Sequence, residues 1–231
     1  MGDAALSDSA LLQLMQLASP ALPVGGFSYS EGLEAAVEAG LVNDELQAGD
    51  WLLDQLHLGL ERADLPVLAA ALSAWRAREP ARVARCNEWI GLTRESAEQR
   101  LQTQQMGRSL TEWLKNRGGT DERVAQLAAL RPAPTWPVAF ALAATLAGAP
   151  CRETLLAFGF GWAENMVQAA MRCVPLGQGA AQRILARLMA ALPEAVGRAA
   201  ARPEEDWQAH TPALAILSSR HETQYSRLFR S

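Results

Sequence analysis

The sequence predicts an all-α protein: a single-domain bundle of about ten helices followed by an extended C-terminal tail. Apolar residues recur at three- and four-residue spacing along nearly the whole chain, which is the period of an α-helix. No stretch shows the convincing two-residue alternation of a β-strand. The 231 residues, 49% of them apolar, are enough for one sizeable core. We therefore expect a helical domain over residues 1–219 and a tail over residues 220–231.

The N-terminal part predicts two helices joined by a glycine turn. The first helix lies before Pro20, behind a candidate cap at Ser7 or Ser9. The turn is Val24-Gly-Gly-Phe27. After it, the spacing of Ser28 and Glu31 predicts a capping box, in which each side chain satisfies a backbone N–H of the other residue at a helix start.

The middle of the chain predicts a nearly continuous series of helices. We expect one helix from Asp44 to about residue 60 and another over residues 64–78, where a proline in the first turn is tolerated. Residues 80–115 contain no strong helix breaker and form one long helix or two nearly continuous ones. The stretch from Thr93 to Gln105 is polar, so most of its circumference needs solvent or a polar interface.

Links that contain proline or glycine separate the remaining helices. Pro132-Ala-Pro134 precedes a helix capped by Thr135, and Val174-Pro-Leu-Gly177 follows a long helix that begins at Pro150. Pro193 predicts a bend or break in the next helix. We expect these helices over residues 120–130, 135–147, 150–173, 178–201 and 211–219.

Charge is unevenly distributed along the chain. Residues 1–61 contain ten acidic and no basic residues, whereas the remainder holds all 21 basic and 15 acidic residues. Such separation favours oriented electrostatic association with a partner. The arginines are spread singly and Lys115 is the single lysine, so nucleic-acid binding is not expected.

The composition indicates a cytoplasmic protein. No run of 18 apolar residues predicts a membrane span, and the acidic N-terminus MGDAALSDSA does not resemble a secretory signal. Cys86, Cys151 and Cys173 lie far apart, which is typical of reduced thiols.

The sequence offers no recognisable catalytic motif. A GxxxxGK[ST] nucleotide loop and a GxSxG nucleophile turn are both absent from it. His221-Glu222 begins like a zinc-binding HExxH motif, but Tyr225 occupies the position of the second histidine. We therefore expect no enzymatic activity, no cofactor and no stable metal site. A two-fold assembly could still bring together His or Cys residues from two copies for a transient metal contact.

The last twelve residues, RHETQYSRLFRS, differ from the rest of the chain. They have no apolar period, yet they place Tyr225 and Phe229 among arginines. Aromatic residues and arginines dominate the binding energy of many protein interfaces. This composition predicts a flexible tail that becomes ordered on binding a partner. A frayed terminus without function is the alternative.

The tail resembles the C-terminal signature of the UreF family of urease accessory proteins. The stretch LASPALPVGGFSYSEGLE, residues 17–34, is also similar to this family, and three shorter segments follow in the family's order: residues 105–110, 137–143 and 174–178. The chain departs from the family's pattern at Trp136, Gly159, Gly161 and Ala215. These departures put in doubt any role of a histidine or aspartate at such positions.

The resemblance implies a non-enzymatic chaperone of urease maturation. UreF proteins are helical homodimers that bridge UreD, also called UreH, and the nickel-carrying GTPase UreG. The complex supports GTP-dependent nickel insertion into apo-urease.

The resemblance also implies site residues. A UreD/UreH interface is expected at Arg220, His221, Glu222, Tyr225, Arg227, Phe229 and Arg230. A weaker candidate for the UreG surface or the dimer axis comprises Pro23, Gly25, Phe27, Ser28, Tyr29 and Glu31, although a glycine turn with a capping box serves folding equally well.

A helical GTPase-activating protein is the alternative function. Such a protein inserts an arginine into the active site of the GTPase, and here the GTPase would be UreG. Arg94, Arg100 and Arg108 in the polar stretch are the candidates.

Overall fold

The computed structural model describes residues 6–118 and 120–230 and confirms the predicted fold class. This part of the chain forms eleven α-helices with no strand among them. The helices are α1 (Asp8–Ala18), α2 (Leu33–Glu38), α3 (Glu45–Gln55), α4 (Asp64–Ala77), α5 (Pro80–Thr93), α6 (Ala97–Asn116), α7 (Glu122–Ala129), α8 (Trp136–Leu146), α9 (Cys151–Cys173), α10 (Gln178–Ala201) and α11 (Pro212–His221). Two 3-10 helices, Gly26–Ser28 and Glu204–Asp206, and a π-helical stretch, Leu56–Leu60, complete the secondary structure.

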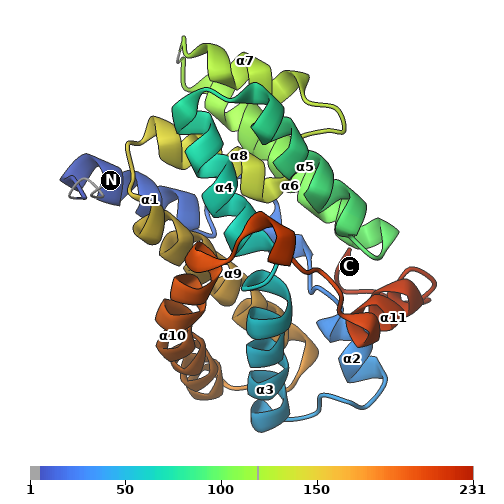
Figure 1. Ribbon diagram of the computed structural model, residues 1–231. Coiled ribbons are helices and arrows are strands. Elements are labelled where there is room, and N and C mark those ends of the chain that lie inside the picture. Colours follow the sequence, from blue (N-terminus) through green and yellow to red (C-terminus); the bar gives the residue numbers. More distant parts are fainter. Residues whose placement is uncertain (1–5, 119, 231) are drawn as a thin grey trace.

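Helix α4 lies near the centre of the bundle (Figure 1). It packs most extensively against α8 and also contacts α5, α9 and α10. Apolar residues cover most of its circumference, and Leu65, Leu68, Leu72 and Trp75 are fully buried. The Trp75 indole N–H donates to the Val138 carbonyl oxygen at 3.1 Å, which satisfies its polar atom inside the core. A helix that is apolar on nearly all sides is stable in water only when other helices surround it.

The polar stretch within residues 80–115 contains a break between two helices. Helix α5 ends at Thr93, and α6 begins after Ser96, whose hydroxyl accepts a hydrogen bond from the Gln99 N–H at 3.1 Å. This break confirms the second of the two predicted alternatives. Helix α10, in contrast, continues through Pro193 without ending.

The link before α8 is held by side chains from two neighbouring helices. The Asn87 side chain accepts a hydrogen bond from the Thr135 N–H at 2.7 Å and donates to the Pro132 carbonyl oxygen at 2.9 Å. The Thr103 hydroxyl accepts from the Trp136 N–H at 3.1 Å. Thr135 occupies the predicted cap position, but its own hydroxyl makes no capping bond.

Part of the charge separation along the chain is neutralised within the fold. Helix α10 places Arg183 2.7 Å from Glu45 on α3 and Arg198 2.7 Å from Glu61. The Arg183–Glu45 pair is exposed and contributes little to stability, whereas Glu61 in the second pair is buried. Both pairs leave less of the N-terminal negative charge for a partner than the sequence predicts.

No helix in the described ranges is both long and apolar enough to cross a membrane. The three cysteines lie within the described residues and form no disulfide bond there, with Cys86 buried and the other two half-buried.

Candidate functional site

The two segments singled out in the sequence lie side by side in the structure. The Arg230 N–H donates to the Ser28 carbonyl oxygen at 2.8 Å. Arg172 on α9 joins the same segments, because its guanidinium donates to the Phe27 carbonyl oxygen at 3.4 Å and lies 5.7 Å from the centre of the Phe229 ring. The C-terminal end of the chain accordingly lies close to α2 and α11 (Figure 1). We call the surface formed by residues 23–31 and 220–230 the tail–turn surface.

The tail is folded back against the body rather than held out from it. Helix α11 extends to His221, so the predicted boundary at residue 219 falls inside a helix. Beyond it, the backbone N–H groups of Leu228 and Phe229 donate to the Glu34 carboxylate at 2.7 and 3.0 Å. Glu34 thus binds the backbone of the tail, and the body covers the Phe229 ring, leaving 5% of it exposed. That the tail becomes ordered on binding a partner stays a prediction.

His221 is completely buried and therefore does not lie at a partner-accessible position. Its Nε2 atom lies 3.1 Å from a Glu34 carboxylate oxygen, and its Nδ1 atom lies 2.9 Å from a Glu98 carboxylate oxygen. The other oxygen of Glu98 accepts from Arg227 at 2.9 Å. Each ring nitrogen therefore has a carboxylate partner. His221 links α2, α6 and α11 in this structure, and its predicted place in the UreD/UreH interface stays a prediction.

The predicted capping box does not form. Ser28 ends a 3-10 helix, and α2 begins only at Leu33. Glu31 and Gly32 between them have left-handed backbone angles, with φ of 51° and 81°, and these angles prevent a helix from starting at Ser28. The Glu31 carboxylate instead accepts hydrogen bonds from the Trp162 indole N–H at 2.9 Å and the Gln102 side chain at 2.7 Å.

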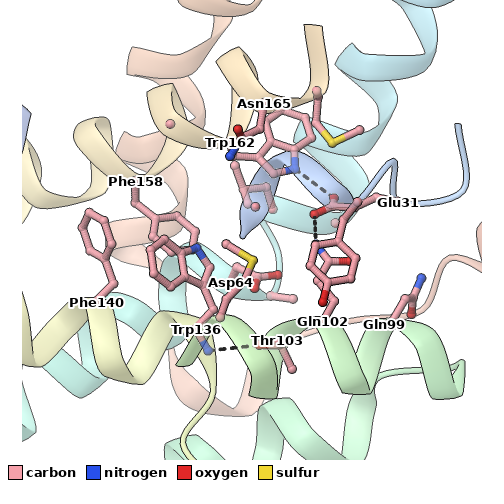
Figure 2. Close-up of a pocket in the computed structure, with 18 of the residues that line it drawn as sticks. Glu31, Asp64, Gln99, Gln102, Thr103, Trp136, Phe140, Phe158, Trp162 and Asn165 are labelled. Atoms are coloured by element: carbon pink, nitrogen blue, oxygen red, sulfur yellow. Dashed lines mark hydrogen bonds between the residues drawn. The ribbon is translucent and has the colours of Figure 1, made fainter. Parts of the chain in front are cut away.

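Glu31 lines a cavity of about 120 Å³ between the glycine turn and helices α4, α6, α8 and α9. Figure 2 shows Trp136, Phe140 and Phe158 on one side of it, with Glu31 and Gln102 on the other. The three rings contact one another with centroid distances of 5.1–5.8 Å. We call this space the Glu31 cavity.

The ionised form of Glu31 is disfavoured in this cavity. Burial raises the pKa of the carboxyl group, and the hydrogen bonds from Trp162 and Gln102 offset only part of that effect. The ion pair between Arg94 and Asp64 also lines the cavity.

Replacing Glu31 with Gln tests the burial of this carboxyl group. Because the pKa of Glu31 is raised in the folded protein, its ionisation lowers the free energy of unfolding as pH rises above the unfolded pKa. Glutamine does not ionise, so the variant lacks this contribution to the pH dependence of the free energy of unfolding. The difference in the free energy of unfolding between Glu31→Gln and the unmodified chain should therefore shift in favour of the variant from pH 4 to pH 7, as measured by urea unfolding. An equal difference at both pH values would contradict the raised pKa.

The remaining predicted site residues divide into exposed and internal groups. Tyr225 is fully exposed, and the other exposed residues are Pro23, Phe27, Arg220, Glu222, Arg227 and Arg230. Tyr29 is buried, and its hydroxyl donates to Gln105 at 2.7 Å. Gly25 has a φ of 78° and forms the turn. These residues therefore do not present one continuous set of side chains to a partner.

Sequence reasoning missed Leu228, which is 70% exposed. Phe229 was selected instead because aromatic residues are prominent at interfaces. Leu228 and Phe229 lie in a bend of the tail, in which the Phe229 ring faces the body and the Leu228 side chain faces solvent. No local pattern in the tail indicates which of these two residues faces the body.

All three candidate arginines make contacts within the chain. Arg94 pairs with Asp64, and the Arg100 guanidinium donates to the carbonyl oxygens of Gly91 and Arg94 at 3.2 and 3.1 Å. Arg100 and Arg108 are both exposed, and Arg108 contacts the side chain of Gln104 at 3.3 Å. Because Arg100 is held by backbone carbonyl oxygens, Arg108 is the less restrained of the two for insertion into another protein.

The part of the chain that the structure describes contains no group of three or more His, Cys, Asp or Glu side chains suited to hold a metal ion. The closest assembly of such groups surrounds His221 with Glu34 and Glu98. These three side chains hold one another and the tail.

Known proteins similar to this chain match it over both the helical body and the tail–turn surface. Residues 42–189 match the family model described as UreF. The chain is 63% identical over 222 residues to urease accessory protein UreF of Methylibium petroleiphilum, covering 96% of this chain and 94% of that protein. It is 57% identical over 229 residues to the protein of the same name in a Polaromonas species, covering 99% and 97%.

A fusion protein is also similar to this chain. The bifunctional urease accessory protein UreEF of Bordetella bronchiseptica is 47% identical over 226 residues. The match covers 96% of this chain and 52% of that protein.

Proposed function

The chain belongs to the UreF family of urease accessory proteins and so has a role in urease maturation; within that role, we propose that it is a non-enzymatic chaperone that bridges UreD/UreH and the GTPase UreG. In this proposal the complex supports GTP-dependent nickel insertion into apo-urease, and the chain acts as a homodimer. The sequence contains no nucleotide loop, so the proposal assigns GTP hydrolysis to UreG. The similarity to a UreEF fusion supports the view that such chains work beside other accessory proteins.

The tail–turn surface is the observation that best supports a UreD/UreH-binding role. Tyr225 and Leu228 project from a segment whose backbone is anchored to the buried Glu34. Anchoring matters because a side chain held on a rigid support loses less conformational entropy on binding. Arg220 and Arg230 are exposed on either side of these residues in the sequence and favour a partner surface with acidic groups, whereas Arg227 is paired with Glu98 within the chain.

The internal positions of His221 and Phe229 change how the interface works. In our proposal these two residues position the tail, and Tyr225 and Leu228 make the partner contacts. The partner therefore meets a surface that is already ordered, rather than ordering a free chain end.

Replacing Tyr225 with Ala should weaken binding to the UreD/UreH partner by about 30-fold, the effect of removing an interface hot spot worth about 2 kcal/mol. The melting temperature should not change, because Tyr225 is fully exposed. Titration calorimetry with the purified partner measures the effect, and Leu228→Ala should act in the same direction. Leu12→Ala on α1 is the matched control, since Leu12 is also an exposed apolar residue. Unchanged binding by a Tyr225→Ala, Leu228→Ala double variant would contradict the proposed interface.

Single-turnover GTP hydrolysis by UreG distinguishes the chaperone from an arginine-inserting activator. A chaperone should change the rate little, whereas an inserted arginine should raise it by about a thousandfold or more. Arg108→Ala is the variant to compare, because Arg108 is exposed. A large rate increase that Arg108→Ala removes would establish the alternative function.

A further inference from the structure

The Glu31 cavity combines an aromatic wall with a polar wall. Trp136, Phe140 and Phe158 form the first, and Trp162 reaches across to hold the Glu31 carboxylate (Figure 2). The cavity volume of about 120 Å³ exceeds what one water molecule needs. At about 30 Å³ per water in the liquid, this volume corresponds to about four water molecules, or to a ligand of about four to five non-hydrogen atoms.

The charges around the cavity are unbalanced. Glu31 and Asp64 are acidic, and Arg94 is the cation that lines the cavity with them. Arg94 is ion-paired with Asp64, whereas the hydrogen-bond donors to Glu31 are the uncharged Trp162 and Gln102. A carboxylate has about four acceptor positions, so two donors leave capacity for a ligand. The excess charge is negative and therefore favours a cation.

The geometry of Glu31 indicates that its carboxylate is held in place for a reason other than helix capping. Its φ of 51° lies in the left-handed region, which a glutamate adopts only at a cost in free energy. Burial raises its pKa, so the ionised form lacks full compensation in the unliganded chain. A cationic ligand would supply that compensation.

The surroundings favour an organic cation over a metal ion. Aromatic faces attract ammonium and guanidinium groups through the ring quadrupole, and they also bind alkyl groups. Hard divalent metal ions prefer six or more oxygen ligands. Across residues 6–118 and 120–230, no three His, Cys, Asp or Glu side chains gather as metal ligands.

We propose that the Glu31 cavity is a binding site for a small organic cation, a primary ammonium or guanidinium compound whose charged group contacts Glu31 and whose carbon atoms contact the aromatic wall. The cavity borders the glycine turn of the tail–turn surface, but its ligand would contact Glu31 and the aromatic wall, whereas Tyr225 and Leu228 make the contacts in the proposed UreD/UreH interface. The site can therefore be present or absent whether or not the proposed UreD/UreH interface is correct.

Three probes of similar size test the charge preference of the cavity in the unmodified chain. n-Butylammonium is the cation, 1-butanol its neutral counterpart and butyrate its anionic counterpart. Binding is measured by chemical-shift titration of the tryptophan indole N–H signals. We expect n-butylammonium to bind at least about tenfold more tightly than 1-butanol, in line with the energy of a charge-assisted hydrogen bond, and butyrate not to bind.

Variants then assign the charge preference to Glu31. Glu31→Gln should bring the affinities for n-butylammonium and 1-butanol within about twofold of each other. Glu38→Gln, the same change at an exposed position on α2, should leave the tenfold preference intact. The probe comparison in the unmodified chain stands even if Glu31→Gln does not fold.

Three results would overturn the proposal. Equal binding of n-butylammonium and 1-butanol to the unmodified chain would indicate an apolar cavity without charge selection. Absence of binding by all three probes at tens of millimolar would indicate a cavity that holds only water. Saturable Ni²⁺ binding that requires Glu31 and displaces n-butylammonium would indicate a metal site instead.

Discussion

Replacing His221 with Ala is expected to lower the free energy of unfolding by about 3 kcal/mol, because two buried carboxyl groups lose the hydrogen-bond partner that they share, at about 1–3 kcal/mol each. His221 is completely buried, and both of its ring nitrogens face carboxylate oxygens of Glu34 and Glu98. Without the ring, the largely buried side chains of Glu34 and Glu98 would each lose a hydrogen-bond partner. Urea unfolding monitored by tryptophan fluorescence measures the loss.

The same substitution should release the tail. The Leu228 and Phe229 N–H groups donate to Glu34, which loses the ring that orients it. Their hydrogen exchange should accelerate more than that of amides in α4. His221→Ala should therefore weaken UreD/UreH binding together with stability, whereas Tyr225→Ala should weaken binding alone.

His210 provides the control for His221→Ala. It is exposed, and its ring lies 3.4 Å from a Glu95 carboxylate oxygen. His210→Ala should change the free energy of unfolding by less than about 0.5 kcal/mol, as surface substitutions usually do. If both substitutions lowered the free energy of unfolding by a similar amount, the buried contacts of His221 would contribute no more to stability than the exposed contact of His210 does.

Gly107→Ala should be destabilising by about 3 kcal/mol, the upper part of the usual range for overpacking. A methyl group at this position of α6 would overlap the Pro134 carbonyl oxygen and lie 2.7 Å from its carbon and 2.8 Å from the Thr135 carbonyl carbon. These are backbone atoms, so a side-chain rotation cannot relieve the overlap. The helix and the link before α8 would have to move apart, and the Trp136 N–H bond to Thr103 would lengthen.

Gly197→Ala on α10 is the matched control. It is also a glycine within a helix, but a methyl group there would have no neighbouring atom within 4 Å. This substitution should stabilise the protein by about 0.5–1 kcal/mol, because alanine favours the helix more than glycine does. Thermal unfolding of both variants compares them directly. A stable Gly107→Ala variant would mean that α6 does not approach the link as closely as the structure shows.

The sequence alone determined the fold class and most helix boundaries. Ser7, Asp44 and Thr135 occupy the cap positions that their residue types predict, and the proline links fall between helices. These features depend on residues three or four positions apart, so local spacing is sufficient to predict them. The membership of the UreF family was likewise recognisable from the tail and the glycine-turn segment.

Local spacing failed at Ser28 and Glu31, where it predicted a capping box. The bonds that decide the conformation of Glu31 come from Gln102 and Trp162, which lie 71 and 131 positions away. A capping box contributes about 1 kcal/mol at most helix starts. Two long-range hydrogen bonds to the half-buried Glu31 carboxylate form in its place, and no pattern within the turn reveals them.

The tail shows what only the tertiary structure decided. Its composition correctly marked an unusual segment, but the choice between Phe229 and Leu228 as the exposed residue depends on Glu34, which lies 195 positions from Phe229. His221 likewise changes from a surface candidate to a buried link, because α2 and α6 each place a carboxylate beside its ring. Residues close together in the sequence determine where each helix begins and ends. The role of each functional side chain depends instead on its contacts with residues that folding brings from distant parts of the chain.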